Sequence, residues 1–131
     1  VLEIVGNLCD REILDFRPRL ELTLRDPEKP WPRVEADDGL DELNYNERKL
    51  DREAEKFQRE RLKSVQWLKG LGAANWTATH EEPKLGPIRA GDLLVSWASY
   101  DAIMSKMIAR RSFDLSQRDA PGFVATYAGE W

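Results

Sequence analysis

Few side chains of this sequence are of the kinds that carry out catalysis. The chain has one cysteine, Cys9, and one histidine, His80, and a thiol beside an imidazole base is a working nucleophilic pair in many enzymes. Cys9, however, falls on the apolar stripe of a helical segment, where a thiol is usually inert packing. The sequence contains no Gly-rich phosphate loop, paired CxxC, HExxH or Gly-x-Ser-x-Gly elbow. The residue types therefore favour a protein without a nucleophilic active site.

The overall composition predicts one globular domain, residues 1–131. The chain is 41% hydrophobic and 34% charged, and 131 residues suffice for a single core without disulfides. The net charge of −4 argues against nucleic acid as a partner, because nucleic-acid-binding proteins carry a basic surface. A single cysteine excludes an internal disulfide and favours a cytoplasmic location. No run of 18 apolar residues occurs, so no membrane partner is predicted.

Three segments have the periodicity of amphipathic helices: 2–25, 47–69 and 90–111. Pro18 lies inside the first segment and predicts a kink near residues 15–17, because proline lacks a backbone donor and crowds the preceding turn. The connections are long and rich in proline and glycine, and no segment reads clearly as a strand. The chain opens within an amphipathic pattern at Val1, so the fold expected is an all-α four-helix bundle that lacks its first helix.

The charged residues of segment 47–69 include many lysines and arginines, which raises the question of a phosphate-binding face. Acidic residues are interleaved with them, and Lys49–Glu53 and Glu55–Arg59 are pairs of opposite sign four residues apart. The acidic residues cancel the positive field, so the pattern indicates a solvated helix face.

The C-terminal segment 112–131 contains Pro121 and Gly122 near the aromatic residues Phe123, Tyr127 and Trp131. Aromatic side chains contribute large apolar surfaces. The segment is therefore predicted to be a tail that packs on the bundle.

Four stretches together carry a likeness to a known family: IVGNLCDREILDFRPRLEL (4–22), YNERKLDREAEKFQRERLKSVQWLKGL (45–71), WTATHEEPKLGPIRAGDLL (76–94) and SWASYDAIMSKMIARR (96–111). In this order they resemble the DinB-like superfamily, which includes bacterial damage-inducible proteins and thiol-dependent transferases. The likeness spans most of the chain. It implies a four-helix bundle whose first helix would precede Val1.

Members of that family typically hold a divalent metal such as nickel or zinc on three histidines, two of them four residues apart on the last helix. The positions that match these ligands are Asn7, Tyr100 and Met104. An amide, a phenol and a thioether do not form a coherent site for such an ion. The resemblance therefore implies that the metal site is lost and that no cofactor is bound.

Two interpretations of Asn7, Tyr100 and Met104 remain open. In the first, they fill the core of the bundle, and Asn7 accepts a hydrogen bond from the Tyr100 hydroxyl. In the second, they line a metal-free pocket for a small-molecule ligand. Asp101 falls on the inward side of its helix and is expected to form an ion pair or a cap, because an unpaired buried carboxylate is costly. Trp97 is expected in the core.

The function predicted is a non-catalytic binding or structural protein, associating as a homodimer as relatives of this fold commonly do. The alternative is an enzyme, a thiol-dependent S-transferase or a metal-dependent hydrolase with a rearranged site. The family's historical name suggests DNA binding, but the acidic balance does not support it.

Overall fold

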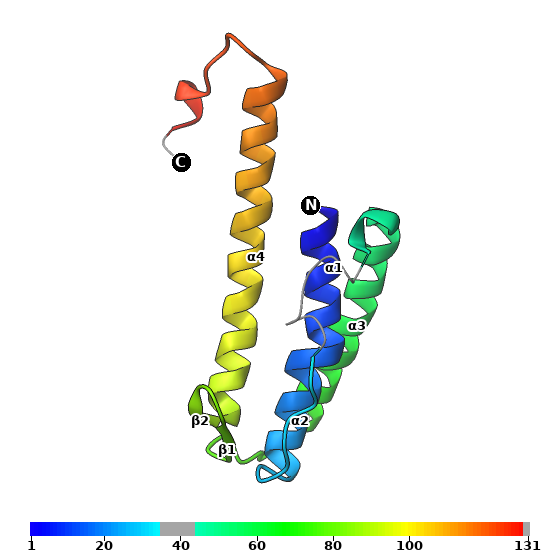
Figure 1. Cartoon of the computed structure of the whole chain (residues 1–131), viewed down its shortest axis with the longest axis vertical. Coiled ribbons are helices and arrows are strands. Elements are labelled where there is room, and N and C mark those ends of the chain that lie inside the picture. The colour runs from blue at the N-terminus through cyan, green and yellow to red at the C-terminus, as the bar shows by residue number, and fades with distance from the viewer. Residues whose placement is uncertain (35–43, 130–131) are drawn as a thin grey trace.

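The fold is that of a computed structural model, which describes residues 1–34 and 44–129. Most of the described chain is helical, with three helical rods and one small antiparallel sheet (Figure 1). The elements in chain order are α1 (Leu2–Arg11), a π-helical turn η1 (Glu12–Phe16), α2 (Arg17–Arg25), a 3-10 turn η4 (Tyr45–Glu47), α3 (Leu50–Gly70), β1 (Thr79–Glu82), β2 (Gly86–Arg89), α4 (Ala90–Asp119) and a 3-10 turn η5 (Thr126–Ala128). The predicted helical class is confirmed.

The first rod consists of α1, η1 and α2 in succession, and the irregularity predicted near residues 15–17 takes the form of the π-helical turn Glu12–Phe16 and not of a break. Pro18 is the second residue of α2 and follows directly on this turn. The turn before it loosens the spacing at which the proline ring would otherwise crowd the preceding carbonyl. The π-helical turn thus interrupts the regular α-helical geometry at one point, but the first rod remains continuous.

The rods pack around the first one. α3 lies along α1, and α4 contacts both α1 and α2. The apolar core is formed by Leu20, Ala90, Leu93 and Trp97, all buried. Phe16 stacks on Trp97 with ring centroids 5.7 Å apart and planes 6° from parallel. Stacked aromatic pairs of this kind add to the free energy gained from burial.

The strands β1 and β2 form a hairpin that precedes α4, so the expectation of no strand was wrong. The strands pair antiparallel, with His80 opposite Ile88, and Gly86 allows the turn with a φ of +80°. Each strand has four residues, too few for an alternating pattern to be recognised in the sequence. His80 is the buried member of β1, and its ring stacks on Trp31 at 4.3 Å between centroids.

The predicted C-terminal tail differs from the structure in two respects. α4 continues to Asp119, eight residues beyond the predicted end at residue 111, so residues 112–119 belong to the helix. In the described part of the tail, residues 120–129, the expected packing on the bundle was wrong: Phe123 is 79% exposed and Tyr127 fully exposed. The reason is that the longer helix carries the tail past the end of the bundle (Figure 1). Trp131 lies outside the described residues.

Among the described residues, no helix combines the length and apolar character needed to cross a membrane.

Candidate functional site

Two of the three predicted site residues meet between α1 and α4. The hydroxyl of Tyr100 donates a hydrogen bond to the Oδ1 atom of Asn7. The Tyr100 ring also packs against Phe16, with centroids 5.5 Å apart. Met104 follows one turn later on α4 and is buried. Burial raises the pKa of the Tyr100 phenol above its ordinary value, so at neutral pH the hydroxyl is a neutral donor.

These residues do not fit the divalent metal that the resemblance implies. The Asn7 oxygen, which would be the best ligand among the three, already accepts a hydrogen bond from the Tyr100 hydroxyl. A neutral phenol and a thioether are poor partners for a borderline ion. In residues 1–34 and 44–129, no three histidine, cysteine, aspartate or glutamate side chains gather in a way that could hold an ion.

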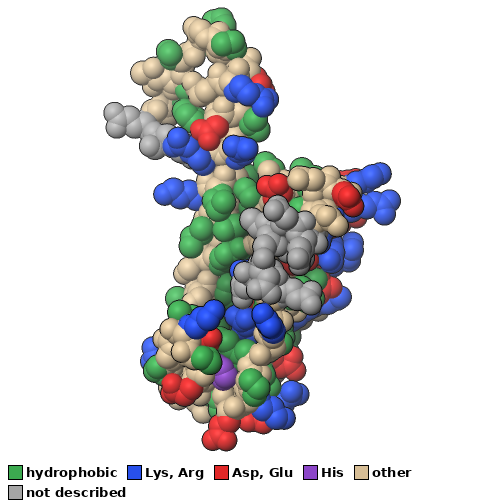
Figure 2. Space-filling view, viewed as in Figure 1, with side chains coloured by type: hydrophobic (Ala, Val, Ile, Leu, Met, Phe, Trp, Pro, Cys, Tyr) green, Lys and Arg blue, Asp and Glu red, His purple; other side chains and the backbone are tan. Residues whose placement is uncertain are grey.

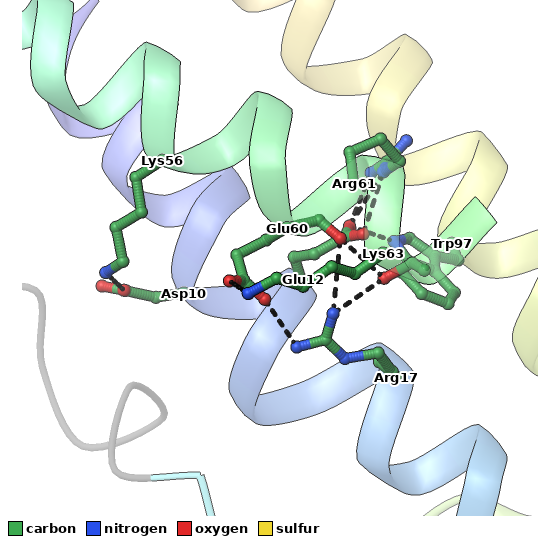
Figure 3. Close-up of polar contacts among 9 residues, drawn as sticks. Asp10, Glu12, Arg17, Lys56, Glu60, Arg61, Lys63 and Trp97 are labelled. Atoms are coloured by element: carbon green, nitrogen blue, oxygen red, sulfur yellow. Dashed lines mark hydrogen bonds and ion pairs between the residues drawn. The ribbon is translucent and has the colours of Figure 1, made fainter. Parts of the chain in front are cut away.

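A buried polar contact between Trp97 and Glu12 lies elsewhere, in what we call the Arg61 cluster: Glu12, Arg61, Trp97 and Asp101. Figure 3 shows side chains from the first rod, α3 and α4 converging there. The Arg61 Nε atom lies 2.9 Å from Glu12 Oε2, and Arg61 Nη2 lies 2.9 Å from Asp101 Oδ1. The Trp97 indole donates to Glu12 Oε2 at 3.0 Å. The cluster therefore joins all three rods through one guanidinium.

The Arg61 cluster is fully paired, which favours a structural role over a catalytic one. Glu12 is only 1% exposed, and its oxygens accept from Arg61 and Trp97. Hydrogen bonds to Asp101, and then to Glu12, raise the pKa of the Arg61 guanidinium further above its ordinary value. A permanently charged arginine with its donors in use has no proton to offer a substrate. The ion pair expected for Asp101 is confirmed.

Glu12 was missed as a buried residue and Arg61 as its half-buried partner, although their spacing contains the signal. Arg61 was counted with the solvated charges of its helix. It nevertheless stands four residues after Phe57 and four before Val65, both on the apolar stripe. Glu12 stands likewise between Leu8 and Phe16. Charged residues of opposite sign at stripe positions of two helices predict a buried ion pair, because either alone would be costly.

The other buried acids of the first rod are also paired. Asp10 lies 3.2 Å from Arg48 and 3.9 Å from Lys56, and Asp15 lies 2.9 Å from Arg19. Next to Asp10, burial and the negative charge of that carboxylate raise the pKa of the Tyr45 phenol to about 12. The polar interior thus holds matched charges along its length.

Gly6 of α1 provides a first prediction at this end of the bundle. A Cβ atom at Gly6 would lie 2.6 Å from the Tyr45 Cε1 atom, well inside van der Waals contact. Gly6→Ala is expected to lower the free energy of unfolding by about 1–3 kcal/mol through this clash, measured by urea denaturation. Gly70→Ala is the control, because nothing lies within 4 Å of a Cβ there. It should be neutral or stabilise by up to about 1 kcal/mol; equal effects of both substitutions would contradict the packing described.

The structure does not bring Cys9 and His80 together. Cys9 is completely buried within α1, and burial raises the pKa of its thiol, which disfavours the reactive thiolate. His80 lies in the hairpin, near the other end of the first rod (Figure 1). Its Nδ1 atom is 2.8 Å from the carbonyl oxygen of Pro27, which can only accept, so Nδ1 carries the proton. This histidine joins the hairpin to the loop after α2.

The grooves beside α4 are lined by residues other than the predicted site. A shallow groove of about 160 Å³ runs between α3 and α4, with Ser64, Leu68, Leu94 and Ala98 beside the Arg61 cluster. A larger one of about 650 Å³ lies between the start of α1 and α4, over Ile4, Ile103 and Met107. Neither groove is lined by Asn7 or Tyr100. The second interpretation of these residues, a ligand pocket, gains no support from these two grooves.

Comparison with known proteins adds no assignment: no family model matches the sequence, and no curated protein matches it.

Proposed function

We propose that this chain is a non-catalytic binding or structural protein of DinB-like descent, related to four-helix bundles that hold a metal on three histidines. In this proposal Asn7, Tyr100 and Met104 occupy the positions of the former ligands and fill them. The observation that carries it is the hydrogen bond from Tyr100 to Asn7 between α4 and α1. The proposal includes a cytoplasmic location and association with a second copy.

Two further features support a role without chemistry. The Arg61 guanidinium pairs with the carboxylates of both Glu12 and Asp101 across the three rods, so these contacts stabilise the bundle and leave no group poised to transfer a proton. The thiol and the imidazole, the only strong nucleophile and neutral-pH base of the chain, lie on different elements with different partners. We therefore propose that the fold serves as a surface that binds another molecule.

The test restores the former ligands. The triple substitution Asn7→His, Tyr100→His and Met104→His is expected to give stoichiometric zinc or nickel binding, because imidazoles four residues apart on α4 face a third on α1. Bound metal is measured by elemental analysis of protein dialysed against the ion, with the unsubstituted protein treated in parallel. The unsubstituted protein is expected to retain none.

Tyr100→Phe is the matched control, since it removes the hydroxyl and keeps the ring. It is expected to bind no metal and to lower the free energy of unfolding by about 1 kcal/mol. Stoichiometric metal in the unsubstituted protein that is lost on chelation would overturn the proposal. A folded triple variant that binds no metal would show that the three positions are not the former ligands.

A further inference from the structure

The groove between the start of α1 and α4, about 650 Å³ in volume, has an apolar lining that is open to solvent. Ile4 of α1 and Ile103 and Met107 of α4 contribute to this lining. Ile103 is 55% exposed and Met107 48% exposed, so about half of each of these apolar side chains is accessible. Small-molecule sites are commonly of this volume and mostly apolar. The groove can therefore accept the apolar part of a ligand.

The charged side chains of the same groove leave one positive charge uncompensated. Three basic residues, Lys106, Arg110 and Arg111, line the groove together with two acidic ones, Glu3 and Asp114. Arg110 pairs with Asp114 at 3.2 Å. Within the described part of the chain, neither Lys106 nor Arg111 forms an ion pair, and Glu3 can offset only one of their two charges. A positive excess in the groove of a chain whose net charge is −4 favours an anionic ligand.

The uncompensated basic residues stand next to the apolar ones on α4. Lys106 follows Ile103 by three residues, and Arg111 follows Met107 by four, which are the spacings at which helical side chains are neighbours. The span from Ile103 to Arg111 is about 12 Å along the helix. Figure 2 shows hydrophobic side chains along the middle of α4 and basic ones where the helix leaves the bundle. The groove thus has an apolar part beside α1 and a basic end beyond it.

We propose that this groove binds a fatty carboxylate, that is, an unbranched alkyl chain that ends in one carboxylate. The alkyl chain lies over Ile4, Ile103 and Met107, and the carboxylate pairs with Arg111. A guanidinium can hold a carboxylate through two parallel hydrogen bonds, and Lys106 adds positive charge beside the chain. The single excess charge of the groove matches a head group that carries one negative charge.

The inference rests on the binding role proposed above and names the class of ligand for it. The groove contains none of the three positions assigned to the former metal ligands. Metal uptake by the triple histidine variant and carboxylate binding by the unsubstituted protein are therefore separate measurements, and either can fail without the other.

Isothermal titration calorimetry of the full chain with sodium decanoate, below the concentration at which it forms micelles, tests the ligand class. Decanoate is expected to bind with a Kd of about 0.5 mM or lower. Each methylene removed from the alkyl chain should weaken binding by up to about fourfold. The uncharged 1-decanol keeps the chain and should bind about tenfold more weakly. No binding of decanoate, or equal binding of 1-decanol, would overturn the proposal.

Substitutions at the two parts of the groove test where the ligand lies. Lys106→Gln with Arg111→Gln should weaken decanoate binding about tenfold or more and leave the binding of 1-decanol unchanged. Ile103→Gln with Met107→Gln should weaken the binding of both ligands. All four side chains are exposed, so the far-ultraviolet circular dichroism of both variants should match that of the unsubstituted protein. Undiminished decanoate binding by both folded variants would contradict the assignment.

The matched control is Arg59→Gln with Lys69→Gln, which removes two exposed positive charges from α3, outside the groove. It should leave the affinity for decanoate unchanged, and a loss equal to that of the Lys106 and Arg111 variant would show an effect of net charge alone and overturn the proposal. Vesicles of anionic phospholipid form a second arm of the experiment. Cosedimentation with the vesicles, without binding of free decanoate, would identify a membrane surface in place of the groove ligand and would also overturn it.

Discussion

Replacing Arg61 with methionine is expected to lower the free energy of unfolding by about 3–5 kcal/mol, because it leaves the Glu12 carboxylate buried without its counter-charge. Glu12 is 1% exposed and keeps only the Trp97 indole as a donor. Asp101, whose side chain is 32% exposed, can be solvated instead. The measurement is urea denaturation followed by far-ultraviolet circular dichroism.

Two controls isolate the buried charge as the cause. Glu12→Gln combined with Arg61→Met should recover part of the lost stability, since the neutral amide no longer needs a cation. Arg59→Met makes the same substitution on the solvated side of α3, where the arginine lies 3.9 Å from Glu55 and is well exposed. That variant should change the free energy of unfolding by no more than about 0.5 kcal/mol. A double variant no more stable than Arg61→Met would show that lost packing, and not charge, dominates.

Trp97→Ala is expected to be comparably destabilising, by about 3–5 kcal/mol, because it removes a large side chain from the centre of the core. Trp97 is 4% exposed, stacks on Phe16 and donates to Glu12. Trp97→Phe separates these contributions: it keeps an aromatic ring and loses the donor, so about 1–3 kcal/mol should be lost. Thermal or urea denaturation of the three proteins side by side gives the comparison.

Tyr127→Ala serves as the reference for an aromatic residue outside the core. Its side chain is fully exposed, so its removal should alter the free energy of unfolding of the monomer by no more than about 0.5 kcal/mol.

If Trp97→Phe lowered the free energy of unfolding as much as Trp97→Ala, the hydrogen bond to Glu12 would outweigh the packing of the Trp97 ring.

The sequence predicts the helices well because their apolar stripes are long. The starts of the first and third rods, and the irregularity before Pro18, follow from spacing and from the missing proline donor. The end of α4 was placed too early because Arg110 and Arg111 suit the last turn of a helix. The first proline or glycine after them is Pro121, and the absence of a breaker between them is the more informative signal.

The candidate site is less accessible to sequence reasoning. The pairing of Tyr100 with Asn7 is an expectation that the structure confirms, since a buried hydroxyl needs a partner and the two helices were already assigned. Predicting the Arg61 cluster from the sequence requires knowing which charged residue of α3 points toward the other helices. That depends on how the three rods are rotated about their axes. A hairpin of four-residue strands leaves almost no periodic trace.

The π-helical turn at Glu12–Phe16 accommodates one residue more than a regular α-helical turn would hold. Each residue of an α-helix advances the side-chain direction by about 100°, and a wider turn takes up one residue's worth of rotation. Upstream of it the rod presents Cys9 to the interior, and downstream it presents Leu20. Deleting a single residue within the turn would convert it to an ordinary α-helical turn and leave the later side chains facing their present neighbours, whereas a deletion elsewhere in the rod would rotate them by about 100°. The π-helical turn thus allows the buried faces of both halves of the first rod to point toward the same interior.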